Sequence, residues 1–277
     1  MFQEKMTMTL KNAIEILREA GIDSPEYDAR EIFRAYCTEP IFSDTECDDP
    51  RLESAIERRK NREPLQYILG SVGFYREEYR VTPDVLIPRA DTETLVDFAV
   101  KNLPEGALFL DLCTGSGCVA ISTLKNTAHT RAVAVDLSEK ALEIARENAE
   151  RNGVSDRIDF LKCDLMSEVV WGEYFALLSN PPYVADRVYE GLEGEIFHEP
   201  KMAFVGGSDG GDFYRRLTPI YRDKIANDGF IAYEIGYDQA ELLRQIADEC
   251  SMSCEIIKDL SGNDRVAVLR RQNLLTK

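Results

Sequence analysis

The sequence is poor in basic residues and has no long apolar run. Lysine and arginine number 33 against 50 aspartates and glutamates, so the formal net charge of the 277 residues is −17. Phosphate contacts need clustered bases, so this deficit disfavours unguided binding to DNA or RNA, although it allows a local basic face. No segment approaches the roughly 18 apolar residues of a membrane span. The N-terminus lacks the apolar core of a secretory signal, and we therefore expect a cytoplasmic protein without a membrane segment.

Cysteine and histidine do not form a metal-binding or disulfide pattern. The seven cysteines are odd in number and include no Cys-x-x-Cys pair. Only two histidines, His129 and His198, could join them around a metal. This pattern predicts reduced thiols and no metal site. Apolar residues make up 44% of the chain, which is enough for a real core.

The N-terminal part of the chain is predicted to be helical. Helix starts are indicated at Thr9, at Ser24-Pro25 and at Asp49-Pro50, each followed by apolar residues at helical spacing. The stretch 51–62 carries five bases and two acids, a local charge of +3. It is either a solvated helix end or a docking patch for a partner.

A change of pattern after residue 64 predicts the domain organisation. Short strands are expected at 66–70 and 79–81, forming a hairpin that links two domains. The first domain, 1–84, contains the helices and the hairpin and is expected to dock the substrate. The second domain is expected to span 85–277.

The second domain alternates helices and strands, which predicts a doubly wound α/β sheet of Rossmann type. Its last two strands suggest an antiparallel edge. The expected helices are 91–101, 117–125, 138–151, 211–226 and 238–249. The expected strands are 107–112, 131–135, 157–161, 174–179, 229–235, 254–258 and 265–270.

A glycine-rich turn follows the first of these strands. Residues 113–117, Cys-Thr-Gly-Ser-Gly, lie between the strand and a helix start, where open α/β sheets bind ligands. Asp136 ends the next strand and can accept hydrogen bonds from both ribose hydroxyls of an adenosine cofactor. This pair alone does not distinguish a dinucleotide from S-adenosylmethionine. Asp111 favours the latter, because a carboxylate would repel a pyrophosphate and attract an ammonium or a sulfonium.

An Asn-Pro-Pro-Tyr turn, residues 180–183, follows a second apolar strand. The prolines end the strand sharply at the carboxyl edge of the sheet. The Asn180 side-chain carbonyl and the Pro181 backbone carbonyl can both accept hydrogens from one planar NH2 group, and Tyr183 can stack on that group. Since amide and exocyclic amine nitrogens are poor nucleophiles, positioning must carry most of the catalysis.

With these motifs the chain resembles the HemK/PrmC proteins, methyltransferases that modify the glutamine of the Gly-Gly-Gln tip in peptide chain release factors. The resemblance covers nearly the whole chain. It is carried by 62–70, 85–89, 92–95, 111–117, 179–183, 199–200, 206–210, 234–236 with Gln239, and 259–265. It implies that 113–117, Asp136, Leu165 and Asn180 line the cofactor site and that 180–183 grip the substrate glutamine. Cys113, Leu165 and His198 depart from the family pattern, and Cys113 stands where glycine is frequent.

The motifs and the resemblance together predict two adjoining sites and a monomeric enzyme. The S-adenosylmethionine site is expected to comprise Asp111, Cys113, Thr114, Gly115, Ser116, Gly117, Asp136, Asp164, Leu165 and Asn180. The substrate site is expected to comprise Asn180, Pro181, Pro182 and Tyr183, of which Asn180, Pro181 and Tyr183 are catalytic.

Two other functions compete with methylation of a release factor. Asn-Pro-Pro-Tyr also suits methylation of an adenine or guanine amino group in DNA or RNA, with the base extruded. From Asp186 to Asp212 seven acids face two bases, a local −5 that would repel nucleic acid, and no direct nucleic-acid contact is expected to be required. A binding module without catalysis is disfavoured because both turns are intact.

Overall fold

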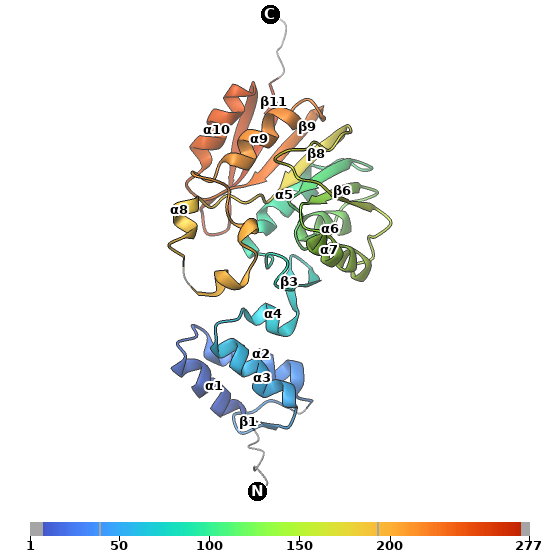
Figure 1. Ribbon diagram of the computed structural model, residues 1–277. Coiled ribbons are helices and arrows are strands. Elements are labelled where there is room, and N and C mark those ends of the chain that lie inside the picture. The colour runs from blue at the N-terminus through green and yellow to red at the C-terminus, as the bar shows by residue number, and fades with distance from the viewer. Residues whose placement is uncertain (1–7, 39, 193, 273–277) are drawn as a thin grey trace, which may run out of the picture. The chain divides into compact units, whose positions relative to one another are not determined.

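The computed structural model describes residues 8–38, 40–192 and 194–272 (Figure 1). The chain divides into two compact units. The helical unit is formed by Met1–Ser71 together with Glu193–His198, and the sheet unit by Val72–Leu192 together with Glu199–Lys277. The first unit therefore ends at Ser71, the first residue of the hairpin, whereas the sequence placed the boundary after the hairpin, at 84.

The helical unit is a small bundle whose helices begin where the sequence indicates. The Thr9 hydroxyl accepts a hydrogen bond from the Asn12 backbone N–H at 3.2 Å, and the Asp49 carboxylate accepts one from the Arg51 N–H at 2.8 Å. These caps confirm two of the three predicted helix starts, and Pro25 opens the other. The elements are β1 (Met8–Thr9), α1 (Leu10–Glu19), α2 (Pro25–Tyr36), β2 (Glu46–Cys47), α3 (Pro50–Lys60), α4 (Leu65–Leu69) and the 3-10 turn η2 (Gly194–His198).

The segment predicted as the first strand of the hairpin is a helix, so that prediction is wrong. Leu65–Leu69 forms α4, and its apolar side chains are buried in the helical unit. The hairpin begins only after it, as β3 (Ser71–Phe74) and β4 (Glu77–Arg80). The hairpin belongs to the sheet unit because the buried Tyr79 hydroxyl bonds the Ser122 hydroxyl at 2.6 Å.

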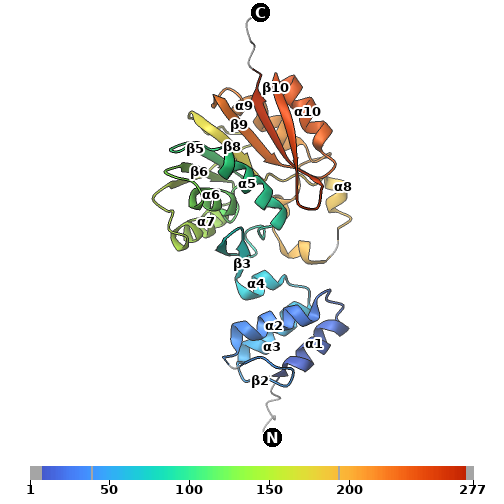
Figure 2. The ribbon, with the colours of Figure 1, turned by 180° about the vertical axis from the view of Figure 1, so that it is seen from behind.

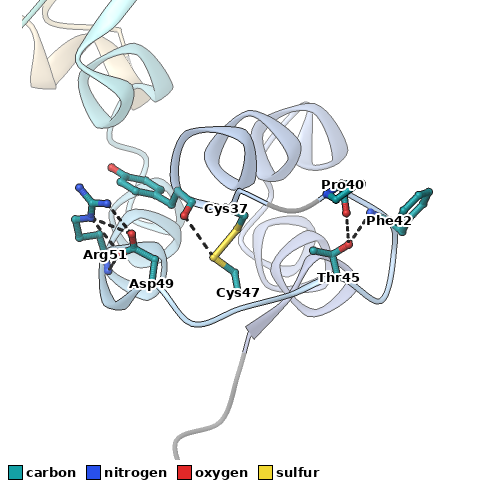
Figure 3. Close-up of a disulfide and its surroundings, with 8 residues drawn as sticks. Cys37, Pro40, Phe42, Thr45, Cys47, Asp49 and Arg51 are labelled. Carbon is teal, nitrogen blue, oxygen red and sulfur yellow. Dashed lines mark hydrogen bonds and ion pairs between the residues drawn. A yellow bond between two sulfur atoms is a disulfide. The ribbon is translucent and has the colours of Figure 1, made fainter.

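A disulfide joins Cys37 and Cys47, which corrects the prediction that all thiols are reduced (Figure 3). The antiparallel pair of β1 and β2 brings Cys47 back to the end of α2, and the two Cα atoms lie 5.9 Å apart. That separation is within the range of disulfides. The odd number of cysteines in the sequence had argued against a disulfide. The other cysteines, Cys113, Cys118, Cys163, Cys250 and Cys254, are free.

The sheet unit contains a seven-stranded sheet in the order β10-β11-β9-β8-β5-β6-β7, shown from two sides in Figures 1 and 2. Its strands from β5 to β9 pair in parallel, and β11 and β10 add an antiparallel edge. This confirms the predicted doubly wound fold with an antiparallel edge. The strands are β5 (Leu108–Leu112), β6 (Arg131–Asp136), β7 (Ile158–Lys162), β8 (Tyr174–Ser179), β9 (Ile225–Glu234), β10 (Met252–Lys258) and β11 (Asp264–Arg271).

Helices cover both faces of the sheet. Along β5 the side chains alternate, so that Phe109 joins the apolar cluster with α5 and α6 while Leu110 joins the cluster with α9 and α10. The helices are α5 (Glu93–Asn102) after the 3-10 turn η1 (Ala90–Thr92), α6 (Cys118–Lys125), α7 (Glu139–Arg151), α8 (Asp186–Tyr189), α9 (Asp212–Tyr221) and α10 (Ala240–Glu249), with a third 3-10 turn, η3 (Lys201–Ala203). The chain reverses direction across the sheet between β5 and β8, where open α/β sheets form their ligand crevice. Across the three described ranges, no helix is long and apolar enough to span a membrane.

Candidate functional site

A cleft opens at the carboxyl ends of β5, β6 and β8, and its empty space, part of which is open to solvent, is about 740 Å³. Of the predicted residues, the cleft is lined by Cys113, Gly115, Asp136, Asp164, Leu165, Asn180 and Pro182. Asp111, Thr114, Ser116, Gly117, Pro181 and Tyr183 do not line it. The structure therefore gathers both predicted turns at one cleft and places part of each behind its wall.

The glycine turn uses left-handed backbone at three positions. The φ angles of Cys113, Gly115 and Gly117 are 60°, 54° and 83°. A Cβ on Gly117 would approach Ile121 Cδ1 to 2.8 Å, whereas one on Gly115 would meet nothing within 4 Å. Gly117 is thus required for packing, and Gly115 leaves bare backbone at the cleft. Cys113 stands at a position that does need positive φ, which costs a side-chain-bearing residue about 1 kcal/mol.

Asp111 braces the glycine turn from behind. Its Oδ2 accepts hydrogen bonds from the Thr114 hydroxyl at 2.6 Å and from the Ala120 N–H at 3.2 Å. Its Oδ1 is buried and has no hydrogen-bond partner in the described part of the chain. Burial raises the pKa of Asp111 to about 7. The carboxylate therefore stabilises the turn through Oδ2, and its Oδ1 remains available as a hydrogen-bond acceptor.

Asp136 connects the end of β6 to the glycine turn. Its Oδ2 accepts the Gly115 N–H at 2.9 Å and its Oδ1 accepts the Ser138 N–H at 2.9 Å. Burial raises the pKa of Asp136. Each carboxylate oxygen keeps a lone pair, because one oxygen can accept two hydrogen bonds. Asp136 can therefore accept hydrogen bonds from hydroxyl groups of a ligand in the cleft.

The loop after β7 supplies a wall with both polar and apolar character. The Asp164 carboxylate accepts hydrogen bonds from the Met166 N–H at 3.0 Å and from the Ser167 hydroxyl at 2.8 Å. The Leu165 side chain is buried and lines the cleft. This wall suits a flat aromatic group with a polar edge.

The Asn180–Tyr183 turn is held by side-chain contacts at both ends. Asn180 Nδ2 donates to the Thr92 hydroxyl at 3.2 Å, which leaves Asn180 Oδ1 as the available acceptor. The Tyr183 hydroxyl donates to Glu234 Oε1 at 3.2 Å, and the Tyr183 carbonyl accepts Gln239 Nε2 at 3.0 Å. Burial raises the pKa of Tyr183, so the phenol stays neutral and is not a base.

Glu199 is a site residue that sequence reasoning did not single out. Its side chain is 2% exposed, its Oε2 accepts the Ile87 N–H at 3.0 Å, and it pairs with Arg89. Val85 and Leu86 line the cleft on one side of this contact, and Pro200, Met202 and Ala203 line it on the other. Glu199 therefore ties two segments of the cleft wall together.

Thr92, Glu234 and Gln239 were also missed as individual residues, although they lie in segments that carry the family resemblance. Glu234 had a detectable signal, because it is an acid at the carboxyl end of an apolar strand, like Asp111 and Asp136. Thr92 and Gln239 had no such signal, since their contacts depend on the tertiary fold.

The charged stretches seen in the sequence are largely neutralised. Arg59 is buried and pairs with Asp28 and Glu195, each at 2.6 Å. The docking-patch reading is therefore wrong for Arg59. Further pairs are Arg51–Asp49, Arg58–Glu63, Lys60–Glu57, Arg89–Glu199, Arg215–Asp209 and Arg215–Asp212. Glu193, one of the seven counted acids, lies outside the described residues.

The cleft fits S-adenosylmethionine in three respects. Gly115 offers open backbone, and Asp136 offers lone pairs for ribose hydroxyls. The free, buried oxygen of Asp111 lies behind the turn, where the ionised carboxylate would favour a cationic ligand. Within the described residues no group of three or more His, Cys, Asp or Glu side chains is arranged to hold a metal ion.

Comparisons with known proteins agree with this architecture. The family model "Methyltransferase small domain" matches residues 90–207, and "PrmC N-terminal domain" matches 43–70. The "Release factor glutamine methyltransferase" of Caulobacter vibrioides is 34% identical over 95% of this chain and 96% of its own length. That of Moorella thermoacetica is 32% identical over 96% and 99%. The solved structure of a ribosomal protein L11 methylase from Lactobacillus delbrueckii subsp. bulgaricus, 21% identical, matches 70% of this chain and 85% of its own with a TM-score of 0.51, a likeness of fold.

Proposed function

The chain belongs to the release factor glutamine methyltransferase family, and from that premise we propose the reaction that it catalyses. It transfers a methyl group from S-adenosylmethionine to the side-chain amide nitrogen, N5, of the glutamine in the Gly-Gly-Gln motif of peptide chain release factors. The observation that carries this proposal is the hydrogen bond from Asn180 Nδ2 to Thr92, which leaves Asn180 Oδ1 free at the cleft.

Asn180 and Pro181 provide two carbonyl acceptors for one NH2 group. The amide nitrogen of Asn180 is engaged with Thr92, and the Pro181 carbonyl accepts no backbone hydrogen bond from the described residues. A primary amide has two N–H donors in one plane, so both acceptors can hold it at once. The glutamine nitrogen is thereby fixed in position, which is the main contribution a site can make to a weak nucleophile.

Methyl transfer then needs charge stabilisation more than a base. When bound, S-adenosylmethionine would supply an electrophilic methyl group, whose bond to sulfur breaks while the electron pair stays on the departing neutral thioether. The amide nitrogen gains positive charge as it attacks, and the carbonyls of Asn180 and Pro181 stabilise that charge through its N–H groups. The surplus proton leaves the nitrogen after attack and passes to water. Tyr183 contributes its ring face rather than its proton, in keeping with its raised pKa.

The geometry of the cleft supports the proposed assignment of the cofactor residues. Asp136 would receive the ribose hydroxyls, Asp164 and Leu165 the adenine, and the turn 113–117 the remainder. Asp111, with Thr114, would favour the cationic end from behind the turn.

The helical unit is proposed to dock the body of the release factor, and the enzyme to act as a cytoplasmic monomer.

The runner-up function is methylation of an adenine or guanine amino group in DNA or RNA. Asn180 and Pro181 would accept such an NH2 group equally well. A protein substrate is favoured because relatives named release factor glutamine methyltransferase match along almost the whole chain.

Labelled S-adenosylmethionine tests the proposal. The protein is incubated with a release factor, with its Gly-Gly-Ala variant, and with DNA or RNA in separate reactions. Label is expected only on the unaltered release factor. Label in nucleic acid, or on the Gly-Gly-Ala variant, would overturn the proposal.

A further inference from the structure

Glu234 is a buried carboxylate beneath the turn 180–183. It ends β9 one residue after Tyr233, which is paired with Ser179 at the end of β8. Glu234 is 1% exposed. Its Oε1 accepts the Tyr183 hydroxyl at 3.2 Å, and its Oε2 has no hydrogen-bond partner in the described ranges. A buried carboxylate that is only partly satisfied is costly, so its presence at this point calls for a function.

Thr92 connects Glu234 to Asn180. The Thr92 hydroxyl accepts the Asn180 Nδ2–H at 3.2 Å and still has its own proton to donate. Burial raises the pKa of Glu234 to about 7, and the Thr92 hydroxyl acts in the opposite direction because it stabilises the charged carboxylate. The Thr92 hydroxyl is therefore close enough to the Glu234 carboxylate to donate its proton to it.

An ionised carboxylate sets the direction of these hydrogen bonds, because it can only accept them. Thr92 and Tyr183 both become donors to Glu234. Thr92 then offers Asn180 a lone pair, and Asn180 must turn its nitrogen toward Thr92 and keep its carbonyl oxygen free. We propose that Glu234 is the positioning residue that fixes the Asn180 carboxamide and the Tyr183 side chain for methyl transfer. This inference rests on the function proposed for the same turn.

The charged and titratable groups around Glu234 come from several elements. Arg265 on β11 favours the charged form of Glu234, and Asp91 in η1 disfavours it. Arg265 is shared, since it pairs with Asp91 and Asp259, each at 3.1 Å. The remaining neighbours that interact with Glu234 electrostatically are Tyr183, Tyr214 and Cys118. Protonated Glu234 would donate a hydrogen bond, and the direction imposed on Thr92 would be lost.

The substitution Glu234→Gln tests this role because it keeps the shape and adds a donor. Turnover, kcat, is expected to fall roughly 10- to 100-fold, as for a misoriented reacting group. The KM for the release factor and the affinity for S-adenosylmethionine should each change by less than about threefold, since binding is not the step affected. Wild-type kcat should rise with pH through about 7, and the variant should lack that rise. Glu255→Gln, at an exposed position on β10, is the matched control and should behave as wild type.

Thr92→Val removes the hydroxyl that links Asn180 to Glu234, and it should reproduce the loss of kcat seen with Glu234→Gln. The double variant should be little worse than the more damaged single variant, since both act on one network. A kcat for Glu234→Gln within about twofold of wild type would overturn the inference. Equal losses of kcat, cofactor affinity and thermal stability would also overturn it, because they indicate a merely structural residue.

A measurement without substrate separates this inference from the proposed function. In 15N-labelled protein the side-chain NH2 signal of Asn180, assigned by its loss in Asn180→Asp, should shift with a midpoint near pH 7. In Glu234→Gln it should not titrate. If the wild type methylates no release factor, the proposed function fails, and this signal still decides the role of Glu234. A signal that titrates alike in both proteins contradicts it.

Discussion

The side-chain nitrogen of Asn180 donates a hydrogen bond to the Thr92 hydroxyl at 3.2 Å, across 88 positions of sequence. Asn180 follows β8, and Thr92 lies in the turn that leads into α5. The contact fixes which end of the carboxamide remains available at the cleft. The turn 180–183, where we propose that the substrate amide binds, is therefore arranged by the fold before any substrate binds, as positioning catalysis requires.

Replacing Asn180 by alanine should remove one of the two carbonyl acceptors for the glutamine amide. We expect kcat to fall by about 100-fold or more, or ~3 kcal/mol of transition-state stabilisation, as when one oriented polar group is lost. The affinity for S-adenosylmethionine, measured by calorimetry, should change much less. Asn102→Ala, at an exposed helix position, is the control. Near-normal turnover of Asn180→Ala would show that the two carbonyls do not hold the amide.

Asp136→Ala should weaken the binding of the cofactor, whereas Asn180→Ala should lower kcat. The substitution removes the acceptor for the ribose hydroxyls and leaves the Gly115 N–H without its partner. We expect the dissociation constant to rise by about 10- to 100-fold, since hydrogen bonds to a charged group are worth roughly 1.5–3 kcal/mol. Calorimetry measures it, with the exposed Asp159→Ala on β7 as control. An unchanged constant would rule out the ribose role.

Burial of Asp111 and Glu234 should make stability depend on pH in an unusual direction. The folded pKa of each carboxyl is about 7, above the ordinary values of 3.8 and 4.5. The neutral, buried carboxyl of each residue therefore stabilises the fold fully at a pH below its ordinary pKa. This stabilisation, on the order of 3 kcal/mol per group, is lost as the pH rises to about 7 and beyond.

Urea unfolding of wild type and Asp111→Asn at several pH values measures this effect. The difference between the two proteins isolates Asp111 from carboxylates with lowered pKa values, such as Asp209. Wild type should lose stability relative to the variant as pH rises between about 4 and 7. A difference that is constant with pH would contradict a raised pKa for Asp111.

The bond between Cys37 and Cys47 should stabilise the helical unit under oxidising conditions. Closure of a loop of this size, with a sequence separation of 10, contributes about 2–3 kcal/mol. A cytoplasm would keep the same pair reduced. Intact mass with and without reductant, and thermal unfolding in both states, check the effect, with Cys37→Ser as a permanently open form. If reductant leaves the mass and the unfolding temperature of the wild type unchanged, the pair does not form in solution.

The sequence was sufficient for most of the fold because strands and helices alternate with clear apolar periodicity. It also located both turns, since glycine and proline mark positions with special backbone angles. It misjudged α4, because a five-residue apolar run suits a short strand as well as one helical turn. It missed the disulfide because the pairing of β1 with β2, which brings the cysteines together, has no local signal.

The site could be predicted only in part for a related reason. The residues of each turn are adjacent in sequence and follow the end of a single strand, so Gly115 and Asn180 could be identified. Their supports come from elsewhere in the chain. Glu234 contacts the turn because β9 lies beside β8 in the sheet. Thr92 and Glu199 reach the turn and the cleft wall from segments outside the sheet. Such partners are decided by tertiary packing, and a single sequence does not record it.

In the proposed reaction the methyl group goes to one amide nitrogen of a release factor. Tandem mass spectrometry of a release factor treated with this protein and S-adenosylmethionine tests it most directly. We predict a gain of one methyl mass on the peptide that contains Gly-Gly-Gln, with fragment ions that place it on the glutamine side chain, and no gain with Asn180→Ala. A methyl group on any other residue, or an unmodified peptide alongside methylated nucleic acid, would contradict the account.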